Sequence, residues 1–230
     1  MKKVLSTKTL NDEIISKARS LNLDVTCIDF IKTIKVDFKL NSIPENIDAI
    51  VFTSSNAVNY LFQNNFASSL IENKNVFSVS GKTKEALIKH NIKPLETADN
   101  ADDLADLILM HNELKSVLHV CGNLALDTLK EKLEAKPVSY FPLVVYETVL
   151  LNEIVKDDFD AVMFYSPSGV ESFFASNKMN KDALYCCIGN TTGEACTKQT
   201  NGAAKIIIAD NAMPQSMIDV LAKEFETLNQ

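Results

Sequence analysis

The chain has 230 residues, of which 46% are hydrophobic and 23% are charged, and its formal net charge is −7. This composition is typical of a soluble globular protein, and the negative charge argues against binding to nucleic acid. Apolar runs all fall well short of about 18 residues, so we expect no transmembrane helix. The basic N-terminus is not followed by the apolar stretch of a secretory signal, and we therefore expect a cytoplasmic protein that does not bind membranes.

Strands and helices are predicted to alternate along the whole chain. The predicted strands are residues 4–6, 25–36, 47–53, 76–79, 93–96, 117–121, 138–149, 161–165, 184–188 and 204–208. The predicted helices are residues 10–21, 56–65, 82–90, 102–112, 124–135, 169–176, 192–199 and 214–226. Regular alternation of this kind predicts parallel sheets that are covered by helices on both faces.

One motif occurs twice, in residues 47–62 and 159–174, and the two copies align without a gap. In each copy an apolar stretch leads into a serine-rich turn and then into an amphipathic segment, which predicts a strand, a turn and a helix. Further matches follow in the same order downstream, so we infer two similar half-molecules. Identical pairs in the motif include Asp48 and Asp160, Phe52 and Phe164, Ser54 and Ser166, Val58 and Val170, and Phe62 and Phe174.

The second copy lacks one strand–helix unit, and the unit at residues 1–24 is left over at the other end of the chain. We infer that this unit completes the second copy. The fold class is therefore α/β, with two similar flavodoxin/Rossmann-like three-layer domains, one discontinuous, joined by a two-stranded β linker. A hinge of this kind predicts a cleft that opens and closes. The expected parts are a discontinuous domain of residues 1–34 and 150–230, an inserted domain of residues 40–142, and linker strands at residues 35–39 and 143–149.

The five cysteines and three histidines have no metal-ligand spacing. No two cysteines form a C-x-x-C pair, and an odd number of cysteines with one vicinal pair is typical of reduced thiols in the cytosol. We therefore expect the cysteines to be structural, and we expect no metal.

Small, hydroxylated turns follow four of the predicted strands, at the sheet edges where α/β proteins bind ligands. Such residues are most often helix N-caps, and Thr191 and Glu194 have the spacing of a capping box. Four turns of one kind in two duplicated domains also indicate a site for an anion, because helix N-termini present free N–H groups and positive dipole ends. The four turns are Ser54-Ser55-Asn56, Ser80-Gly81-Lys82-Thr83, Ser166-Pro167-Ser168-Gly169 and Gly189-Asn190-Thr191-Thr192.

The sequence has no nucleotide-binding glycine loop, no G-x-S-x-G motif and no histidine near the serine-rich turns. No acid–base dyad is recognisable either. The remaining candidate for proton transfer is Tyr146, in the second predicted linker strand. A tyrosine at such a position is often a packing residue, but its hydroxyl can also act as a hydrogen-bond donor or weak acid.

Taken together, these motifs resemble the uroporphyrinogen-III synthase family, the ring-closing enzymes of tetrapyrrole (haem) biosynthesis. The matching segments occur in the family's order and span nearly the whole chain. They are Phe-Thr-Ser-Ser-Asn-Ala-Val at residues 52–58, Ser-Gly-Lys-Thr at 80–83, Tyr-Glu-Thr at 146–148, Phe-Tyr-Ser-Pro-Ser-Gly-Val at 164–170, Ile-Gly-Asn-Thr-Thr at 188–192 and Ala-Met-Pro at 212–214.

The resemblance implies a hydro-lyase that cyclises hydroxymethylbilane to uroporphyrinogen III, with inversion of ring D and loss of water. It implies no cofactor, a monomer, and transient contact with hydroxymethylbilane synthase. Because the free bilane closes spontaneously to the other isomer, much of the catalysis would lie in orienting the substrate.

By motif match, the resemblance makes Tyr146 the catalytic residue that assists departure of the hydroxyl. This chain differs from the family's pattern at two positions that are often arginine. The family often has Thr-Arg where this chain has Thr7-Lys8, and Arg-Gly where this chain has Cys121-Gly122. The expected substrate-binding residues are Thr7, Lys8, Ser54, Ser55, Asn56, Gly81, Thr83, Ser166, Ser168, Gly169, Gly189, Thr191 and Thr192.

Two other classes of protein fit parts of the pattern. Periplasmic-type binding proteins also have two α/β domains and a double-crossing hinge, but we expect neither their signal peptide nor the DNA-binding domain of their repressor relatives. A response-regulator-like domain needs an acidic pair after the first strand, which residues 4–12 do not offer. Isomer-specific ring closure without an added cofactor is predicted by the synthase interpretation alone.

Overall fold

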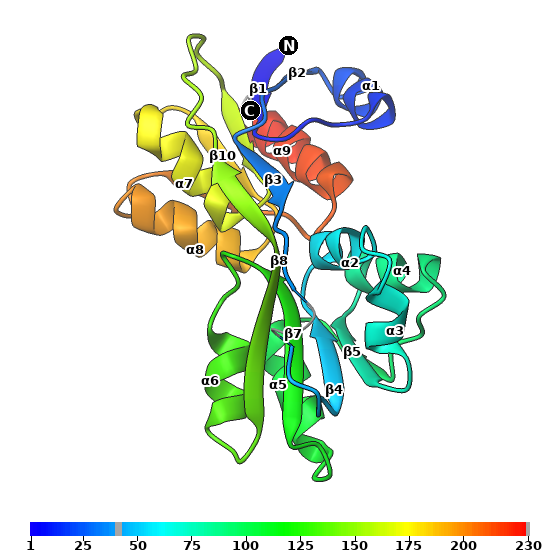
Figure 1. Ribbon diagram of the computed structural model, residues 1–230. Coiled ribbons are helices and arrows are strands. Elements are labelled where there is room, and N and C mark those ends of the chain that lie inside the picture. The colour runs from blue at the N-terminus through cyan, green and yellow to red at the C-terminus, as the bar shows by residue number, and fades with distance from the viewer. Residues whose placement is uncertain (40–42, 229–230) are drawn as a thin grey trace. The chain divides into compact units, whose positions relative to one another are not determined.

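The computed structural model describes residues 1–39 and 43–228. It divides into two units, which are described separately (Figure 1). The discontinuous unit consists of Met1–Lys32 and Val149–Gln230, and the inserted unit consists of Thr33–Thr148. The chain passes from one unit to the other in β3 (Ile31–Lys35) and returns in β8 (Ser139–Leu150).

The inserted unit contains a sheet with the strand order β3-β8-β7-β4-β5-β6. Ile50 and Phe52 of β4 point to a core shared with α2, α3 and α4, whereas Ala49 and Val51 point to a core shared with α5 and α6. A sheet buried on both faces explains why β4 is apolar throughout. The elements of this unit, besides β3 and β8, are β4 (Ala49–Phe52), α2 (Ser55–Leu61), α3 (Ala67–Ile71), β5 (Asn75–Val79), α4 (Lys82–Lys89), β6 (Glu96–Ala98), α5 (Ala101–Met110), β7 (Ser116–Gly122) and α6 (Thr128–Glu134).

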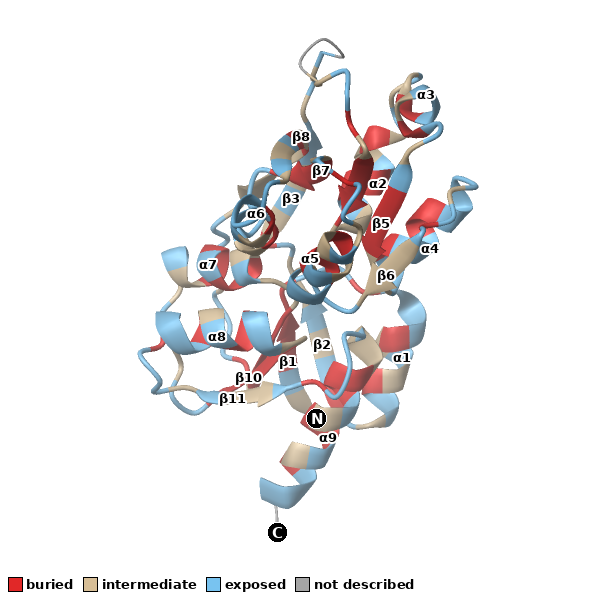
Figure 2. Ribbon diagram, turned by 90° about the horizontal axis from the view of Figure 1, so that it is seen from below, coloured by how far each residue is buried: buried red, intermediate tan, exposed pale blue. Residues whose placement is uncertain are grey.

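The discontinuous unit contains a parallel sheet with the strand order β11-β10-β9-β1-β2. One of its cores lies between the sheet and helices α1 and α9, and the other lies between the sheet and helices α7 and α8. Figure 2 shows buried residues along the strands and exposed residues on the outer faces of the helices. The elements are β1 (Lys2–Ser6), α1 (Asp12–Ser20), β2 (Leu23–Cys27), β9 (Ala161–Phe164), α7 (Pro167–Ser176), β10 (Leu184–Cys187), α8 (Asn190–Gln199), β11 (Lys205–Ile208) and α9 (Pro214–Leu228).

The sequence repeat corresponds to one topology used twice. The order β6-β5-β4-β7-β8 in the inserted unit matches β11-β10-β9-β1-β2 in the discontinuous unit. Asp48 precedes β4 and accepts backbone hydrogen bonds from Lys115 and Ser116, at the start of β7, at 2.8 and 2.9 Å. Asp160 precedes β9 and accepts one from Lys3, in β1, at 2.8 Å. Each aspartate therefore ties a central strand to its neighbour, and the predicted fold class, with one discontinuous domain, is confirmed.

One predicted strand is wrong because the chain leaves one sheet for the other within it. The predicted strand 25–36 is in fact two strands, β2 and β3, which belong to different sheets. Between them, Ile28 and Phe30 still donate backbone hydrogen bonds to Ser6 and Thr7, at 3.0 and 3.4 Å, so this segment follows β1 before it leaves the sheet. The predicted linker strand 35–39 is also displaced, because β3 ends at Lys35 and residues 36–39 have no regular structure.

The predicted helix 56–65 is too long, because α2 ends at Leu61 and the next helix, α3, begins only at Ala67. The side-chain amide of Asn64 donates hydrogen bonds of 3.2 and 3.0 Å to the carbonyls of Tyr60 and Leu61, and this ends α2. Across the described residues, no helix is both long and apolar enough to cross a membrane. The domain boundaries predicted from the sequence stay a prediction.

Candidate active site

In the inserted unit, strands β4, β5, β6 and β7 run parallel and end at one edge of the sheet, here called the carboxyl edge. Ser54 follows β4 and caps α2, because its Oγ accepts a hydrogen bond of 3.2 Å from the backbone N–H of Asn56. Gly81 follows β5 and begins α4 with a φ of 65°, which glycine adopts without strain. Among the described residues no side chain caps α4, so its first-turn amides have no side-chain acceptor there.

The other residues predicted for this edge differ in exposure. Asn56 is exposed and Ser55 is half-buried, both in the first turn of α2. Thr83 is only 4% exposed, in the first turn of α4. Thr83 is therefore buried, and its part in binding a ligand stays a prediction.

Tyr146 lies at the same edge because β8 is parallel to β7 and pairs it with Gly122. Its hydroxyl donates a hydrogen bond of 3.2 Å to Oγ of Ser54. Its ring stacks on Tyr60, with the ring centroids 5.5 Å apart and an angle of 18° between the planes. A Cβ atom at position 122 would lie 2.4 Å from Cζ of Tyr146, so the ring lies directly against the glycine backbone. Neither Gly122 nor Tyr60 was among the predicted site residues, and their spacing in the sequence gives no signal of this contact.

Burial raises the pKa of Tyr146 above its ordinary value of 10.0, although the hydrogen bond to Ser54 acts in the opposite direction. The phenol is therefore neutral near pH 7 and carries a proton that it can donate. Its proton is directed toward Ser54, at the carboxyl edge. The arrangement suits a hydrogen-bond donor or weak general acid.

The discontinuous unit has a corresponding carboxyl edge at the ends of β1, β9 and β10. Ser166 caps α7 by accepting a hydrogen bond of 3.1 Å from the backbone N–H of Gly169, and its Oγ lies 3.0 Å from Oγ of Ser168. The hydroxyl of Thr7 donates a hydrogen bond of 2.7 Å to the carbonyl of Met163. A Cβ at position 169 would lie 3.8 Å from that hydroxyl, so the four predicted residues of this edge are neighbours. Lys8 follows Thr7 in the chain and is exposed.

Helix α8 begins earlier than its sequence predicts. Gly189 is the N-cap, and no side chain in the described part of the chain caps the helix. Thr191 lies inside the first turn and is exposed, whereas Thr192 is buried at 4% exposure. The predicted capping box of Thr191 and Glu194 is therefore wrong, because the helix starts two residues before the position that the box requires.

Both edges thus repeat one arrangement. A helix with a serine cap, at Ser54 or Ser166, lies beside a helix that begins at a glycine, Gly81 or Gly189, and has no side-chain cap. Uncapped N-terminal amides with the positive end of the helix dipole can bind a carboxylate without arginine.

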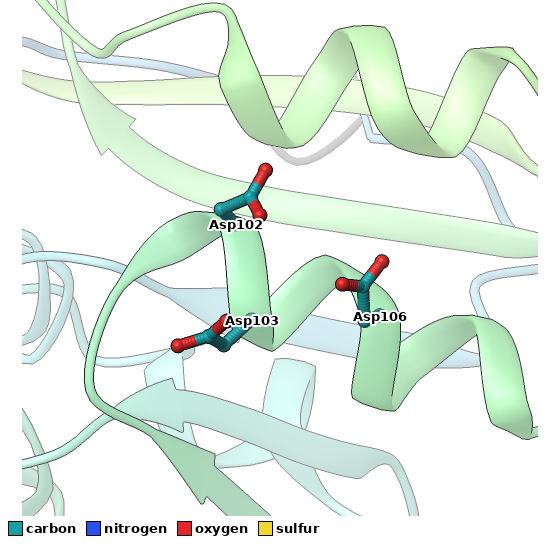
Figure 3. Close-up of side chains that lie close together, drawn as sticks. All are labelled: Asp102, Asp103 and Asp106. Carbon is teal, nitrogen blue, oxygen red and sulfur yellow. The ribbon is translucent and has the colours of Figure 1, made fainter.

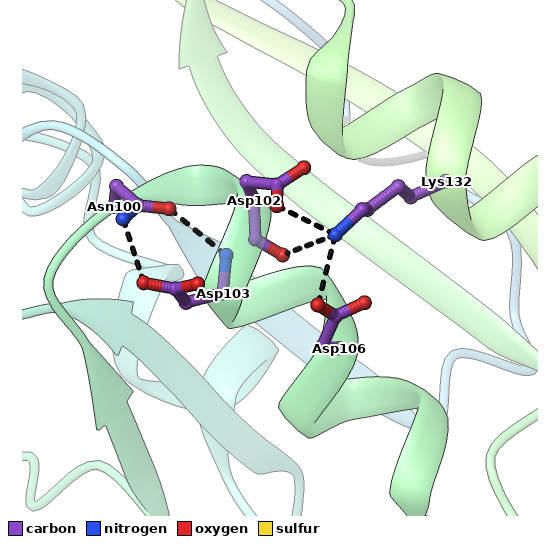
Figure 4. A network of polar contacts seen from close by, with 5 residues as sticks. All are labelled: Asn100, Asp102, Asp103, Asp106 and Lys132. Carbon is purple, nitrogen blue, oxygen red and sulfur yellow. Dashed lines mark hydrogen bonds and ion pairs between the residues drawn. The ribbon is translucent and has the colours of Figure 1, made fainter.

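An acidic cluster in the inserted unit has the close carboxylates of a possible metal site, but its partners within the protein explain it. The side chains of Asp102, Asp103 and Asp106 project from the start of α5, and their carboxylate oxygens lie within 4.8 Å of one another (Figure 3). Nζ of Lys132, from α6, lies 2.7 Å from Asp102 and 2.9 Å from Asp106 (Figure 4). Asp103 accepts a hydrogen bond of 2.7 Å from the side chain of Asn100. The cluster joins α5 to α6 and complements the positive end of the α5 dipole.

A family model described as uroporphyrinogen-III synthase HemD matches residues 12–219. The chain belongs to the uroporphyrinogen-III synthase family. Membership in this family assigns to the chain a hydro-lyase activity that closes hydroxymethylbilane to uroporphyrinogen III. The family suspected from the ordered sequence motifs is therefore confirmed.

Solved structures of uroporphyrinogen-III synthases have the same fold. A mutant of the enzyme from Thermus thermophilus has a TM-score of 0.72 at 15% identity, covering 99% of this chain and 100% of that chain. The enzyme from Helicobacter pylori has a TM-score of 0.70 at 18% identity, covering 97% and 100%. A second crystal form of the Thermus enzyme, wild type, has a TM-score of 0.57 at 14% identity, covering both chains fully. No curated protein sequence matches this chain.

Proposed function

We propose that Tyr146 donates the proton that lets the substrate hydroxyl depart, and that the helix starts of the carboxyl edges bind the substrate carboxylates. The observation that carries the proposal is the hydrogen bond from the neutral Tyr146 to Ser54. The donatable proton and the uncapped start of α4 thus belong to the same edge of the sheet, where α/β proteins bind ligands.

The proposed step balances without a cofactor. The bond between the terminal methylene and its hydroxyl breaks, the departing oxygen takes a proton from Tyr146, and water leaves. A pyrrole nitrogen supplies the electron pair that expels the hydroxyl, and this leaves the methylene carbon as an electrophile. Ring D then attacks the resulting electrophile through its substituted carbon, and the bond from that carbon to the methylene that joins rings C and D breaks. That methylene bonds to the free α-carbon of ring D, and the proton that this carbon loses as the pyrrole re-forms returns the tyrosine to its neutral state. Nothing is oxidised or reduced, so no redox group is needed.

Substrate orientation rests on charge and on the backbone. The bilane is rich in carboxylates, and the first-turn amides of α4 and α8 have no side-chain acceptor of their own. The small turn residues leave the approach to these amides open, since a Cβ at Gly189 would meet no atom within 4 Å. Lys8 adds a cation at the edge of the discontinuous unit. Holding several carboxylates at once fixes which carbon of ring D reaches the reacting centre.

The residues proposed to bind substrate are those that the motifs indicated. In the inserted unit, Ser54, Ser55, Asn56, Gly81 and Thr83 would act through the starts of α2 and α4. In the discontinuous unit the candidates are Thr7, Lys8, Ser166, Ser168, Gly169, Gly189, Thr191 and Thr192.

The decisive variant is Tyr146→Phe, with Tyr60→Phe as its matched control. Tyr60 stacks on Tyr146, but its own hydroxyl donates to the carbonyl of Thr33 at 2.8 Å, away from Ser54. We expect Tyr146→Phe to lower kcat by roughly a hundredfold and Tyr60→Phe to leave it within about threefold. Wild-type turnover in Tyr146→Phe would refute the role of the phenol as a proton donor.

We further propose that the protein is a cytoplasmic monomer and that it receives the bilane from hydroxymethylbilane synthase in a transient encounter. The instability of the free bilane supports a short interval between release and capture. Sedimentation of the protein alone would test whether it is a monomer. Sedimentation of a mixture with hydroxymethylbilane synthase would test the encounter.

A further inference from the structure

A histidine that the proposed chemistry does not use is fully buried beneath the carboxyl edge. His119, on β7, is 1% exposed and is held at both ring nitrogens. Nε2 lies 2.8 Å from the hydroxyl of Thr53, and Nδ1 lies 2.7 Å from the hydroxyl of Tyr140 on β8. The three side chains link β8, β7 and the turn that follows β4. Ser54 lies in that turn, Gly122 ends β7 and Tyr146 lies within β8.

The network acts on the face of the sheet opposite Tyr146. His119 pairs with Val51 in the β4–β7 register, and Val51 belongs to the core beneath α5 and α6. Tyr140 packs against the same core, whereas Tyr146 packs against the core beneath α2. Thr53 is therefore anchored from one face, while the next residue, Ser54, accepts the hydrogen bond of Tyr146 on the other.

Burial keeps the imidazole neutral, because desolvation lowers the pKa of His119 to about 4. A neutral ring has one donor and one acceptor nitrogen, so Thr53 and Tyr140 must take complementary roles. In either tautomer Nε2 holds the Thr53 hydroxyl, and a buried network whose members are paired is rigid.

We propose that His119 is a positioning residue of the synthase reaction, which acts through Thr53 to fix the β4–α2 turn and so the distance between Ser54 and Tyr146. This inference rests on the proposed role of Tyr146. A small shift of the turn would lengthen the hydrogen bond that directs the phenol, and such misplacement lowers the rate of the chemical step rather than the affinity for substrate.

The test compares His119→Leu, Thr53→Val and the double variant. Each single change removes the link between His119 and Thr53 and keeps a similar volume. We expect each to lower kcat roughly tenfold with KM within about twofold, and we expect the double variant to be no slower than either single variant. His119→Gln, which can still donate to Thr53, should recover most of the rate.

Loss of stability needs its own control. Thr200→Val removes a buried threonine hydroxyl that donates to the carbonyl of Cys196 at 2.8 Å in the discontinuous unit. It should lower the melting temperature without changing kcat. A fall in kcat that follows the fall in melting temperature equally in all variants, or additive losses in the double variant, would overturn the inference.

A last comparison separates this inference from the function on which it rests. If His119 acts through Tyr146, His119→Leu should slow the wild type but have little further effect on Tyr146→Phe. A slow Tyr146→Phe with a wild-type rate in His119→Leu would overturn only the inference. Wild-type turnover in Tyr146→Phe would overturn the proposed function itself.

Discussion

The ring of Tyr146 lies so close to the backbone of Gly122 that a Cβ atom at position 122 would be 2.4 Å from Cζ and 2.8 Å from the hydroxyl of the tyrosine. The contact follows from the register of two parallel strands, β7 and β8, which shifts between Cys121 and Gly122 and places Tyr146 opposite the glycine. The absence of a side chain at Gly122 is thus what lets the tyrosine reach Ser54.

Gly122→Ala is therefore expected to displace Tyr146 and to lower kcat by at least about tenfold, because the hydrogen bond to Ser54 cannot form from a shifted ring. The overlap should also destabilise the fold by about 1–3 kcal/mol. Steady-state kinetics and chemical denaturation measure the two effects. Gly122→Ala should cost little further stability in a Tyr146→Ala background, where the overlapping ring is gone, and an undiminished cost there would mean that the alanine strains some other contact.

Ser54→Ala removes both the cap of α2 and the acceptor of Tyr146. Loss of the cap should cost about 1 kcal/mol of unfolding free energy. Ser166→Ala is the matched control for stability, because Ser166 caps α7 at the equivalent position of the repeat. The two variants should lose similar stability, while kcat should fall further in Ser54→Ala, where the phenol also loses its partner. An equal fall in kcat in both variants would argue against a role of the hydrogen bond between Tyr146 and Ser54 in catalysis.

Asp48 should contribute to stability in a pH-dependent way. Backbone N–H donation from Lys115, followed by the hydroxyl and backbone of Ser116, lowers its pKa below the ordinary value of 3.8. A lowered folded-state pKa means that the carboxylate stabilises the fold above pH 3.8, and that this contribution is lost as the pH falls through the folded-state pKa. Asp48→Asn should therefore be less stable than the wild type at neutral pH, and the difference should shrink in acid. A difference that is constant with pH in denaturation experiments would contradict this explanation.

Removal of metal ions should have no effect on the protein, because Lys132 already forms ion pairs with both Asp102 and Asp106. All three side chains are substantially exposed, so the ion pairs themselves contribute little. We expect the same melting temperature and the same kcat before and after treatment with EDTA. A loss that magnesium or calcium restores would show that the acidic cluster binds a cation.

Much of the fold was accessible from the sequence because its strongest signals are local or repeated. The match between Asp48 and Asp160 indicated two similar units, and the regular alternation of strands and helices indicated parallel sheets. The division of residues 25–36 into β2 and β3 was not accessible, since a run of β-formers does not reveal where the chain leaves one sheet for another.

The site was only partly predictable, for a related reason. The serine caps Ser54 and Ser166 have a local signature, and the structure has both of them. Thr191 has such a signature as well, but the helix begins at Gly189. The contacts of Gly122 with Tyr146 and of His119 with Thr53 join distant strands. A histidine within an apolar strand looks the same whether it is packed or functional, and only the register of the sheet separates the two.

The most direct test is the isomer composition of the product formed from hydroxymethylbilane by the wild type and by Tyr146→Phe. The bilane would be generated in situ, and the oxidised uroporphyrins would be separated by chromatography. We predict that type III dominates with the wild type, and that Tyr146→Phe forms type III so slowly that spontaneous type I becomes a large fraction. Only type I from the wild type, or undiminished type III from Tyr146→Phe, would contradict this account of the site.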